Sequence, residues 1–247
     1  MSYIYTTTQR GYLHAHFCED FCLAIAPNPD WFFGVVSDGC SSGDDSHFAS
    51  VLSCKILKKL IYRIDLQQYH LQQNNTPKII VNNLLHNFIA DFKKQKDELD
   101  LEPLELLATM LLLTYHAPTK QAFISVLGDG IVNIDEVIHE IDQQNVPDYP
   151  AYHLNDKKEE LDKYFAKNTF EVNNPTQLAI ATDGVMAFKH ETNAFNTDEL
   201  KAANFLLLDR SLSRTTNMLS RKINILRSEH HLVPADDVAI VRIILEI

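Results

Sequence analysis

Glycine is scarce in this chain, and most of its glycines stand next to an aspartate. Of the 7 glycines among 247 residues, five adjoin an Asp. Three of these places read Asp-Gly at the end of an apolar run: Asp38-Gly39, Asp129-Gly130 and Asp183-Gly184. Glycine is needed where the backbone turns with positive φ or approaches another group closely. Each run therefore predicts a strand that ends in a carboxylate, and the repetition suggests a cluster of carboxylates that needs a metal ion.

The order of apolar runs predicts an α+β fold. Two hairpins are expected at 21–37 and 106–127 because each contains two apolar runs joined by a turn. Two long helices lie between them, the first with apolar residues at helical spacing and the second with Pro77 in its first turn. The remaining predicted elements are a strand, a polar region with a short helix that could form a flap, a strand, two helices and a final strand: 131–138, 142–174, 177–182, 197–208, 213–227 and 237–245. A β-sandwich with a helical pair on each outer face accommodates this order.

Length and charge narrow the class of protein. A chain of 247 residues is expected to form one domain, 1–247. The net charge of −11 disfavours a nucleic-acid or anionic-membrane surface. No apolar stretch is long enough for a transmembrane helix. The first ten residues are polar and contain no hydrophobic signal region, so the cytoplasm is the default expectation.

The cysteines do not indicate a metal site of their own. All four lie in the first quarter of the chain and lack paired CxxC spacing, which disfavours a zinc cluster of His14, His16, Cys18 and Cys22. Cys22 and Cys54 are instead expected to be small core residues.

Acidic residues recur at the predicted strand ends. They are Glu19, Asp20, Asp38, Asp129, Asp183 and Asp236, with Asp237 beside the last. Two carboxylates about 4 Å apart repel by roughly 4 kcal/mol at an effective dielectric of 20, so protons or cations must relieve a cluster of them. Oxygen ligands favour Mg²⁺ or Mn²⁺ over zinc, and two such ions can activate a bridging water and hold a phosphoryl group. A single Asp-Gly after a strand is usually only a turn, so the inference depends on the whole series.

The order and spacing of these motifs resemble the PPM/PP2C family of metal-dependent serine/threonine protein phosphatases, in particular its bacterial branch with Asp-Gly-Cys-Ser-Ser. The matching segments, in chain order, are Glu19-Asp20, Phe33 to Gly39, Ala108-Thr109, Leu127 to Gly130, Ala181 to Gly184 and Asp236 to Ile240. The resemblance implies a four-layer α-β-β-α sandwich flanked by antiparallel helix pairs. It also implies hydrolysis of phosphoserine and phosphothreonine on proteins, by a water that two Mn²⁺ or Mg²⁺ ions activate. The implied partners are a phosphoprotein substrate and a Ser/Thr kinase.

The resemblance also assigns roles to individual residues. Asp38 would bridge both metals, with the Gly39 carbonyl as a further ligand. Asp183 and Asp236 would hold the first metal, Glu19 the second, and Asp129 a weaker third. Asp20 would orient the attacking water, and Asp237, where the family often has Asn, would be a supporting residue.

Three positions depart from the family pattern. The phosphate-binding Arg of the family corresponds to Ala15, and His14 or His16 could make that contact instead. The family's His after Asp-Gly is Cys40, and its Ser after Gly-Asp is Gly130. The alternative reading is therefore a pseudophosphatase or signalling module that binds metal or a partner without efficient hydrolysis. An unrelated phosphoesterase or nucleotide hydrolase is disfavoured because the chain has no Walker loop.

Overall fold

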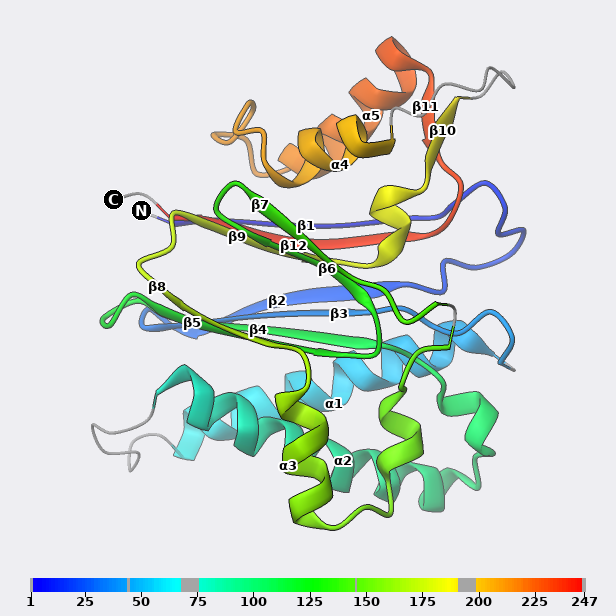
Figure 1. Ribbon diagram of the computed structural model, residues 1–247, viewed down its shortest axis with the longest axis vertical. Helices are drawn as coiled ribbons and strands as arrows, with labels where there is room; N and C mark the ends of the chain where they lie inside the picture. The colour runs from blue at the N-terminus through cyan, green and yellow to red at the C-terminus, as the bar shows by residue number, and fades with distance from the viewer. Residues whose placement is uncertain (1, 44, 68–75, 145, 191–198, 246–247) are drawn as a thin grey trace.

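Two antiparallel sheets of five strands each face one another in the computed structural model, which describes residues 2–43, 45–67, 76–144, 146–190 and 199–245 (Figure 1). The first sheet has the order β1 (Ser2–Gln9), β12 (Val238–Leu245), β9 (Gln177–Ala181), β6 (Gly130–Ile134) and β7 (Val137–Ile141). The second has the order β2 (Phe21–Asn28), β3 (Trp31–Ser37), β4 (Met110–His116), β5 (Gln121–Leu127) and β8 (Thr169–Asn173). A separate pair joins β10 (Phe188–His190) to β11 (Leu232–Pro234).

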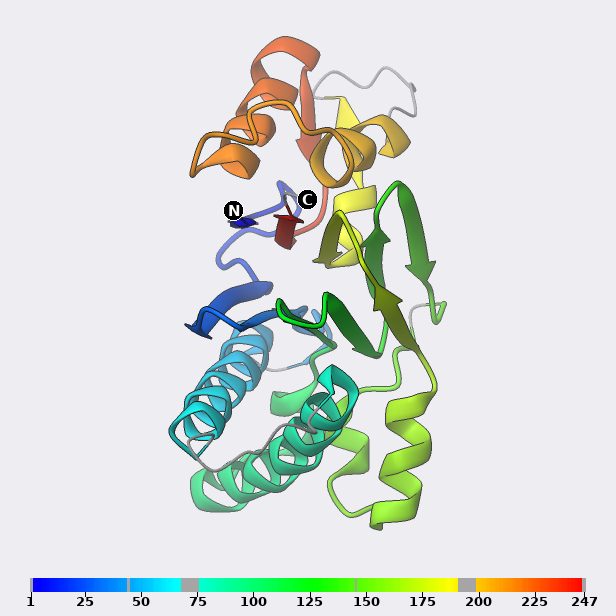
Figure 2. The ribbon, with the colours of Figure 1, turned by 90° about the vertical axis from the view of Figure 1, so that its left-hand side faces the viewer.

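Helices cover the outer face of each sheet (Figures 1 and 2). The outer face of the second sheet packs against α1 (Ser46–Gln67), α2 (Pro77–Leu99) and α3 (Lys158–Ala166). The first sheet is covered by α4 (Glu199–Leu207) and α5 (Met218–His230). The connections within the described ranges contain the short 3₁₀ helices η2 (Pro103–Leu106), η3 (Pro150–His153) and η4 (Asp183–Met186). The predicted sandwich with helices on both outer faces is confirmed.

Burial on both faces of the central strands explains the long apolar runs. In β12 every residue is buried: Val241 and Ile243 pack between the sheets, whereas Ile240 and Ile244 pack against the helices. Side chains alternate between the two faces of a strand, so a strand that is covered on both faces is mostly apolar; in β12 the exception is Arg242, which is hydrogen-bonded.

The structure differs from the sequence expectation at several elements. The predicted strand 131–138 is two strands, because the chain reverses at Asp135, which has a φ of 54° and accepts hydrogen bonds from Thr176 and Gln177. The predicted flap region contains a strand, β8, and β1 was not expected at all. The predicted helix 197–208 is described only from Glu199, since 197–198 lie outside the described residues. Within the described part of the chain, no helix is long and apolar enough to cross a membrane.

Candidate metal centre

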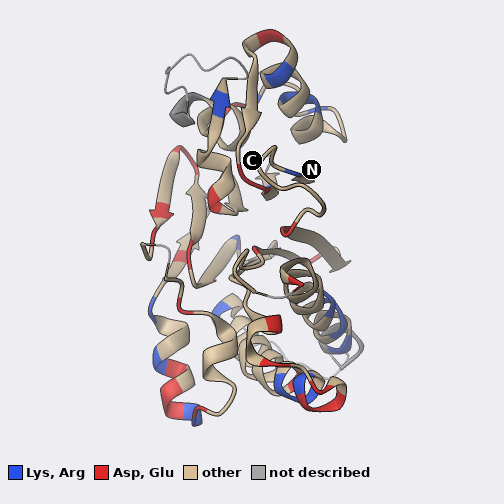
Figure 3. Cartoon of the chain, turned by 90° about the vertical axis from the view of Figure 1, so that its right-hand side faces the viewer, with Lys and Arg blue, Asp and Glu red and all other residues tan. Residues whose placement is uncertain are grey.

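Among the described residues, eight acidic residues stand where strands of both sheets begin or end; these strand ends lie at the right-hand side of Figure 1, the side that faces the viewer in Figure 3. Strand pairing brings these ends together: Phe21 pairs with Ser37, Gly130 with Ile141, and Ala181 with both Ile131 and Ile240. We call the resulting group the acidic centre; its members are Glu19, Asp20, Asp38, Asp129, Asp142, Asp183, Asp236 and Asp237. The structure therefore brings together every carboxylate that the sequence singled out, and adds Asp142.

Asp20 and Asp38 lie side by side in the acidic centre, where Asp20 is buried and Asp38 half-buried. Thr182 Oγ1 donates a hydrogen bond to Asp20 Oδ2 over 2.6 Å. Burial raises the pKa of Asp20 to about 8, and burial together with the charges of Asp20 and Asp183 raises the pKa of Asp38 well above its usual value. Neighbouring carboxyl groups with raised pKa values are not both ionised without a counter-charge, so a bound cation would allow both to ionise.

Asp129 and Asp183 extend the centre toward β6 and β9. Burial and the charge of Asp183 raise the pKa of Asp129 to about 6. Burial and the charge of Asp236 raise the pKa of Asp183, and Asp142 adds negative charge beside both Asp129 and Asp183. Positive charge is thus missing on this side of the centre among the residues that the structure describes.

His14 is the basic side chain that faces the acidic centre. Its Nε2 lies 2.9 Å from Asp236 Oδ1, and its Nδ1 lies 3.3 Å from Asp237 Oδ2 and 3.5 Å from Glu19 Oε2. Both His14 and His16 line an adjoining hollow of 250 Å³, together with Phe17, Glu19 and the first residues of α1. Of the two histidines that the sequence offered, His14 is the one in contact with the carboxylates.

Asp237 organises the backbone of the centre. It is buried, and its carboxylate accepts hydrogen bonds from the backbone N–H of Gly11 at 2.7 Å and of Glu19 at 2.5 Å. Its own N–H donates to Asp236 Oδ1 at 2.8 Å. Asp237 thereby ties both ends of the loop 11–19 to the start of β12, which fixes the position of Glu19 and His14.

Close backbone contacts explain two of the Asp-Gly pairs. A Cβ on Gly184 would lie 1.8 Å from the carbonyl oxygen of Asp237, and a Cβ on Gly39 would lie 2.2 Å from that of Ser46. Only glycine permits such an approach. Asp38 is held from the other side by Thr109, whose Oγ1 accepts from Asp38 N and whose N–H donates to Asp38 O.

The sequence reasoning missed two residues at the centre. Asp142 had a signal, since it follows β7; a hairpin at Asp135 returns β7 to the end of the sheet where β6 begins, and so places Asp142 near Asp129. Tyr149 had none, because it is one tyrosine in a polar region. Its hydroxyl interacts with the Cys40 thiol, and burial, Cys40 and the charges of Asp38 and Asp129 together raise its pKa.

The segment 142–167, which carries Tyr149, is held rigidly by polar contacts. Gln143 joins it to the centre: its Nε2 donates to Gly128 O at 2.7 Å and its Oε1 accepts from Asp148 N at 2.6 Å. Asp148 in turn contacts His153 Nε2 at 2.8 Å and Lys167 Nζ at 3.1 Å. Tyr164 donates its hydroxyl hydrogen to Asp148 O. These hydrogen bonds and ion pairs hold the segment that places Tyr149 at the centre.

The cysteines lie outside this constellation or at its edge. All four are free. Cys22 lies between the sheets, where its thiol contacts Thr7 O and Ile240 O, and burial raises its pKa to about 12. Cys54 is completely buried, as expected for a core residue. Cys40 is half-buried beside Ser42 and Tyr149, next to the Asp38-Gly39 turn.

The donor set suits a hard divalent cation, although the side chains are not arranged around one. In the described ranges, no group of three or more His, Cys, Asp and Glu side chains has a geometry that would hold a metal ion. The buried carboxylates nevertheless offer only oxygen, the ligand that Mg²⁺ and Mn²⁺ prefer, and their raised pKa values show that they lack a counter-charge. Binding a cation requires carboxylates with raised pKa values, such as Asp20 and Asp38, to be ionised.

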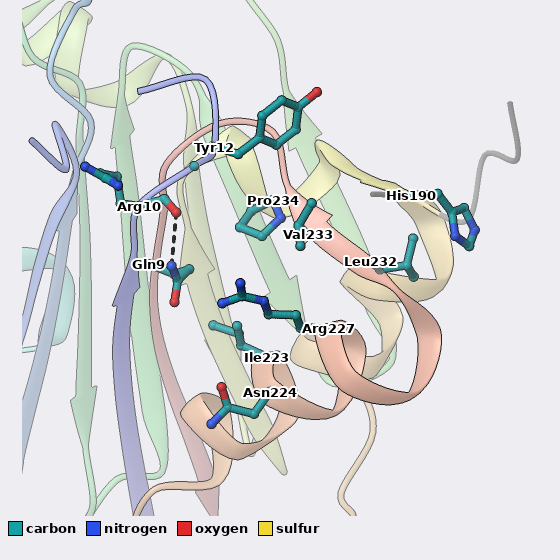
Figure 4. A pocket seen from close by; sticks show the side chains of 11 residues that line it. Gln9, Arg10, Tyr12, His190, Ile223, Asn224, Arg227, Leu232, Val233 and Pro234 are labelled. Atoms are coloured by element: carbon teal, nitrogen blue, oxygen red, sulfur yellow. Dashed lines mark hydrogen bonds between the residues drawn. The ribbon is translucent and has the colours of Figure 1, made fainter. Parts of the chain in front are cut away.

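A larger hollow of 440 Å³ lies on the other side of the loop that begins at Gly11 (Figure 4). It is bounded by β11, α5 and the end of β1, where Gln9 Nε2 donates to Arg10 O at 3.0 Å. None of the carboxylates of the acidic centre lines it. The centre is therefore the better candidate for the functional site.

Comparison with known proteins identifies the family. The family model for protein phosphatase 2C matches residues 10–232. A search of curated protein sequences gives no significant match. Among solved structures, the serine/threonine phosphatase Stp1 from Staphylococcus aureus is similar, with a TM-score of 0.66, 13% identity, and coverage of 100% of this chain and 96% of Stp1.

Two further structures share the fold. RsbX in complex with magnesium has a TM-score of 0.55 and 12% identity, with 98% of this chain and 94% of RsbX covered. The PP2C phosphatase domain with a regulatory fragment of SpoIIE from Bacillus subtilis has a TM-score of 0.59 and 12% identity; the match covers 100% of this chain but only 64% of that one. Since the family model spans most of its length, the chain belongs to the protein phosphatase 2C family of protein serine/threonine phosphatases.

Proposed function

We propose that the chain hydrolyses phosphoserine and phosphothreonine on proteins with two divalent cations, Mn²⁺ or Mg²⁺, bound at the acidic centre, and a weaker third. The observation that carries the proposal is the burial of several carboxylates against one another with raised pKa values. The family is metal-dependent, and the similar structure of RsbX contains magnesium. The partner that opposes the activity of this chain would be a Ser/Thr kinase.

The carboxylates divide into ligands by position. Asp38 would bridge the two ions, with the Gly39 carbonyl beside it. Asp183 and Asp236 would complete one site and Glu19 the other, while Asp129 would hold the third ion. When bound, such ions neutralise phosphoryl charge and lower the pKa of a water to make it a nucleophile.

Residues of the chain orient the reactants. Thr182 fixes Oδ2 of Asp20, which leaves Oδ1 free to accept a hydrogen bond from the attacking water once the contact with Asp38 is broken. His14 stands where the loop 11–19 meets Asp236, one residue before the Ala15 that replaces the family's Arg. We infer that His14, rather than His16, donates a hydrogen bond to the substrate phosphate.

Turnover of p-nitrophenyl phosphate and of a phosphothreonine peptide with and without Mn²⁺ tests the proposal. We expect metal-dependent turnover that Asp38→Asn reduces by at least about 100-fold, since it removes a charge from the bridging position. Asp91→Asn is the matched control, because Asp91 pairs with Lys59 between α1 and α2, on the helical layer. A wild-type protein without metal-dependent turnover would contradict the proposal.

Cys40 and the position of His14 favour one alternative, a pseudophosphatase. The imidazole already faces three carboxylates, and Cys40 replaces the family's histidine after Asp-Gly. Such a protein would bind Mn²⁺ in a calorimeter but would not turn over either substrate. Turnover at the level of an ordinary phosphatase would exclude it.

A further inference from the structure

Exposed apolar side chains concentrate around the acidic centre. Eleven large apolar side chains are exposed among the described residues, and five of them lie on two short segments that flank the centre. We call four of these five the apolar rim: Leu13, Phe17, Val146 and Tyr152; the fifth, Tyr12, lines the 440 Å³ hollow instead. The others are scattered over α1, α2, η2, β1 and β7. Single exposed apolar residues are ordinary, but a group of them beside a polar site marks an interaction surface.

One side of the rim is the loop 11–17, which also carries His14. Leu13 is 65% exposed and precedes the histidine whose Nε2 contacts Asp236. Phe17 is 60% exposed, and its ring stacks on His47 with 4.4 Å between centroids. Backbone hydrogen bonds from Tyr12 N to Pro234 O and from Leu13 N to Ala235 O fix the loop. These side chains are thus held in solvent by a fixed backbone.

The opposite side is the start of the braced segment 142–167. Val146 is 77% exposed and Tyr152 is 57% exposed, and both line an open hollow of 630 Å³. Between them in sequence stands Tyr149, which reaches the centre at Cys40. Backbone hydrogen bonds from Val146 N to Gln143 O and from Tyr152 N to Tyr149 O hold this side as well.

Each side of the rim therefore alternates between contact with the acidic centre and exposure to solvent. A polypeptide whose phosphorylated side chain reaches His14 and the carboxylates would bring its neighbouring residues close to the loop that carries Leu13 and Phe17 and to the segment that carries Tyr149, Val146 and Tyr152. A second copy of the chain seated on the rim would cover the centre, and a small phosphate ester would leave the rim uncovered. The occupant that covers the rim while its phosphate enters the centre is a polypeptide.

We propose that the apolar rim binds the residues on either side of the phosphorylated side chain, and that the enzyme prefers phosphosites flanked by large apolar residues. The inference rests on the proposed function and specifies its substrate class. Burial of apolar surface stabilises such a complex without any charge pattern in the substrate.

Two peptides with the same phosphothreonine test the proposal, one flanked by leucines and the other by serines. In wild-type protein we expect kcat/KM to favour the leucine-flanked peptide about tenfold, which is typical of discrimination by an apolar pocket. In the double variant Leu13→Ser/Phe17→Ser the ratio should fall to about 1. The single variants replace the double one if thermal melting shows that it does not fold.

The control is Ile79→Ser/Val137→Ser, which removes two exposed apolar side chains on α2 and β7 and should leave the ratio unchanged. Equal kcat/KM for the two peptides in wild-type protein would overturn the proposal, as would a preference that survives in Leu13→Ser/Phe17→Ser. Hydrolysis of p-nitrophenyl phosphate separately reports the proposed function. If turnover is absent, fluorescence anisotropy of the two labelled peptides applies the same criterion to binding.

Discussion

His14 stands between three carboxylates, and its two ring nitrogens have different neighbours. Nε2 faces Asp236, whereas Nδ1 faces Glu19 and Asp237. If cations take Glu19 and Asp236 as ligands, as proposed, the imidazole would lose two of these partners and become available to a phosphate. The same histidine would thus contact carboxylates in the metal-free centre and the substrate phosphate in the metal-loaded one.

We expect His14→Gln to lower kcat/KM for a phosphothreonine peptide by about 10–100-fold, the range for groups that support metal-site chemistry. Steady-state kinetics at saturating Mn²⁺ measure the effect. His86→Gln is the matched control, since His86 pairs with Asp162 between α2 and α3. The same loss in His16→Gln, with His14→Gln unaffected, would transfer the role to His16.

Tyr149 contributes a single hydroxyl to the centre. Tyr149→Phe removes its interaction with Cys40 and its proximity to Asp38 and Asp129 while the ring still packs. We expect kcat to fall about tenfold with little change in KM, if the hydroxyl acts only on the reacting centre. Tyr164→Phe removes a hydroxyl that bonds Asp148 O, and should cost about 1 kcal/mol of unfolding free energy with kcat retained. Equal kcat values for wild type and Tyr149→Phe would contradict the role.

The sequence was sufficient to predict those site residues that directly follow a strand. Asp38, Asp129 and Asp183 end apolar runs, so their convergence follows once the strands are paired. It did not reach Tyr149, because long-range packing of the segment 142–167 decides where that side chain lies. The sequence did not decide whether His14 or His16 contacts the phosphate for a similar reason. The direction of a side chain in a loop depends on contacts such as those of Asp237.

At the scale of elements, two buried positively charged side chains hold the end of α4, one from α5 and one from the first sheet. Lys222 of α5 donates to Phe205 O at 2.7 Å and to Asp209 Oδ1 at 2.7 Å. Arg242 of β12 donates to Leu206 O and Leu208 O, each at 2.8 Å. The last carbonyls of a helix lack intrahelical donors and carry partial negative charge, so cations stabilise that end. Both positively charged side chains thereby stabilise the end of α4, and neither contributes a counter-charge to the acidic centre.

Asp148 makes the central polar contacts of the segment 142–167. Burial alone would raise its pKa, but hydrogen bonds from His153 and Lys167 and their charges outweigh burial, and the pKa lies below 3.8. A depressed carboxyl pKa stabilises the folded segment above the unfolded value and loses that effect as pH falls through the folded value. The segment is therefore expected to loosen only below about pH 4.

Asp148→Asn should loosen the same segment at neutral pH. The loss of charge-assisted hydrogen bonds is expected to cost about 1.5–3 kcal/mol of unfolding free energy. Hydrogen exchange read by mass spectrometry should show faster exchange in 142–167 while β3 and β12 stay protected. Asp156→Asn, which keeps the Asp148 contacts of His153 and Lys167, should have a smaller effect. Uniformly faster exchange across the sheets would instead indicate global destabilisation.

At the scale of the whole molecule, the layered architecture was predictable because its strands are apolar on both faces and its helices follow hairpins in a fixed order. The exceptions are β1, β8, β10 and β11, which are short or polar and become strands only by pairing with a neighbour. In β1, for instance, Thr6 to Thr8 pair with Val241 to Ala239 of β12. Their structure is decided by tertiary contacts, which composition and periodicity do not report.

The acidic centre links metal binding to the stability of the whole molecule. In the metal-free chain, burial raises the pKa of Asp20 to about 8 and that of Asp129 to about 6, whereas both would titrate near 3.8 when unfolded. Between pH 4 and pH 8 the folded state therefore binds more protons than the unfolded state, and its free energy of unfolding decreases as pH rises. Cations need ionised ligands, so their stabilising effect grows over the same interval.

We therefore expect the melting temperature in chelator to fall as pH rises from 5 to 8, and Mn²⁺ to counteract that fall. At 100 times its Kd an ion stabilises by about 2.7 kcal/mol, which for a chain of this size corresponds to roughly 5–10 °C at pH 8. Scanning calorimetry with EDTA or Mn²⁺ at pH 5, 6.5 and 8 measures both curves. In Asp38→Asn the two curves should nearly coincide, because the bridging carboxylate is gone. Melting temperatures of the wild type that do not respond to Mn²⁺ at pH 8 would mean that the buried carboxylates are neutralised by protons alone.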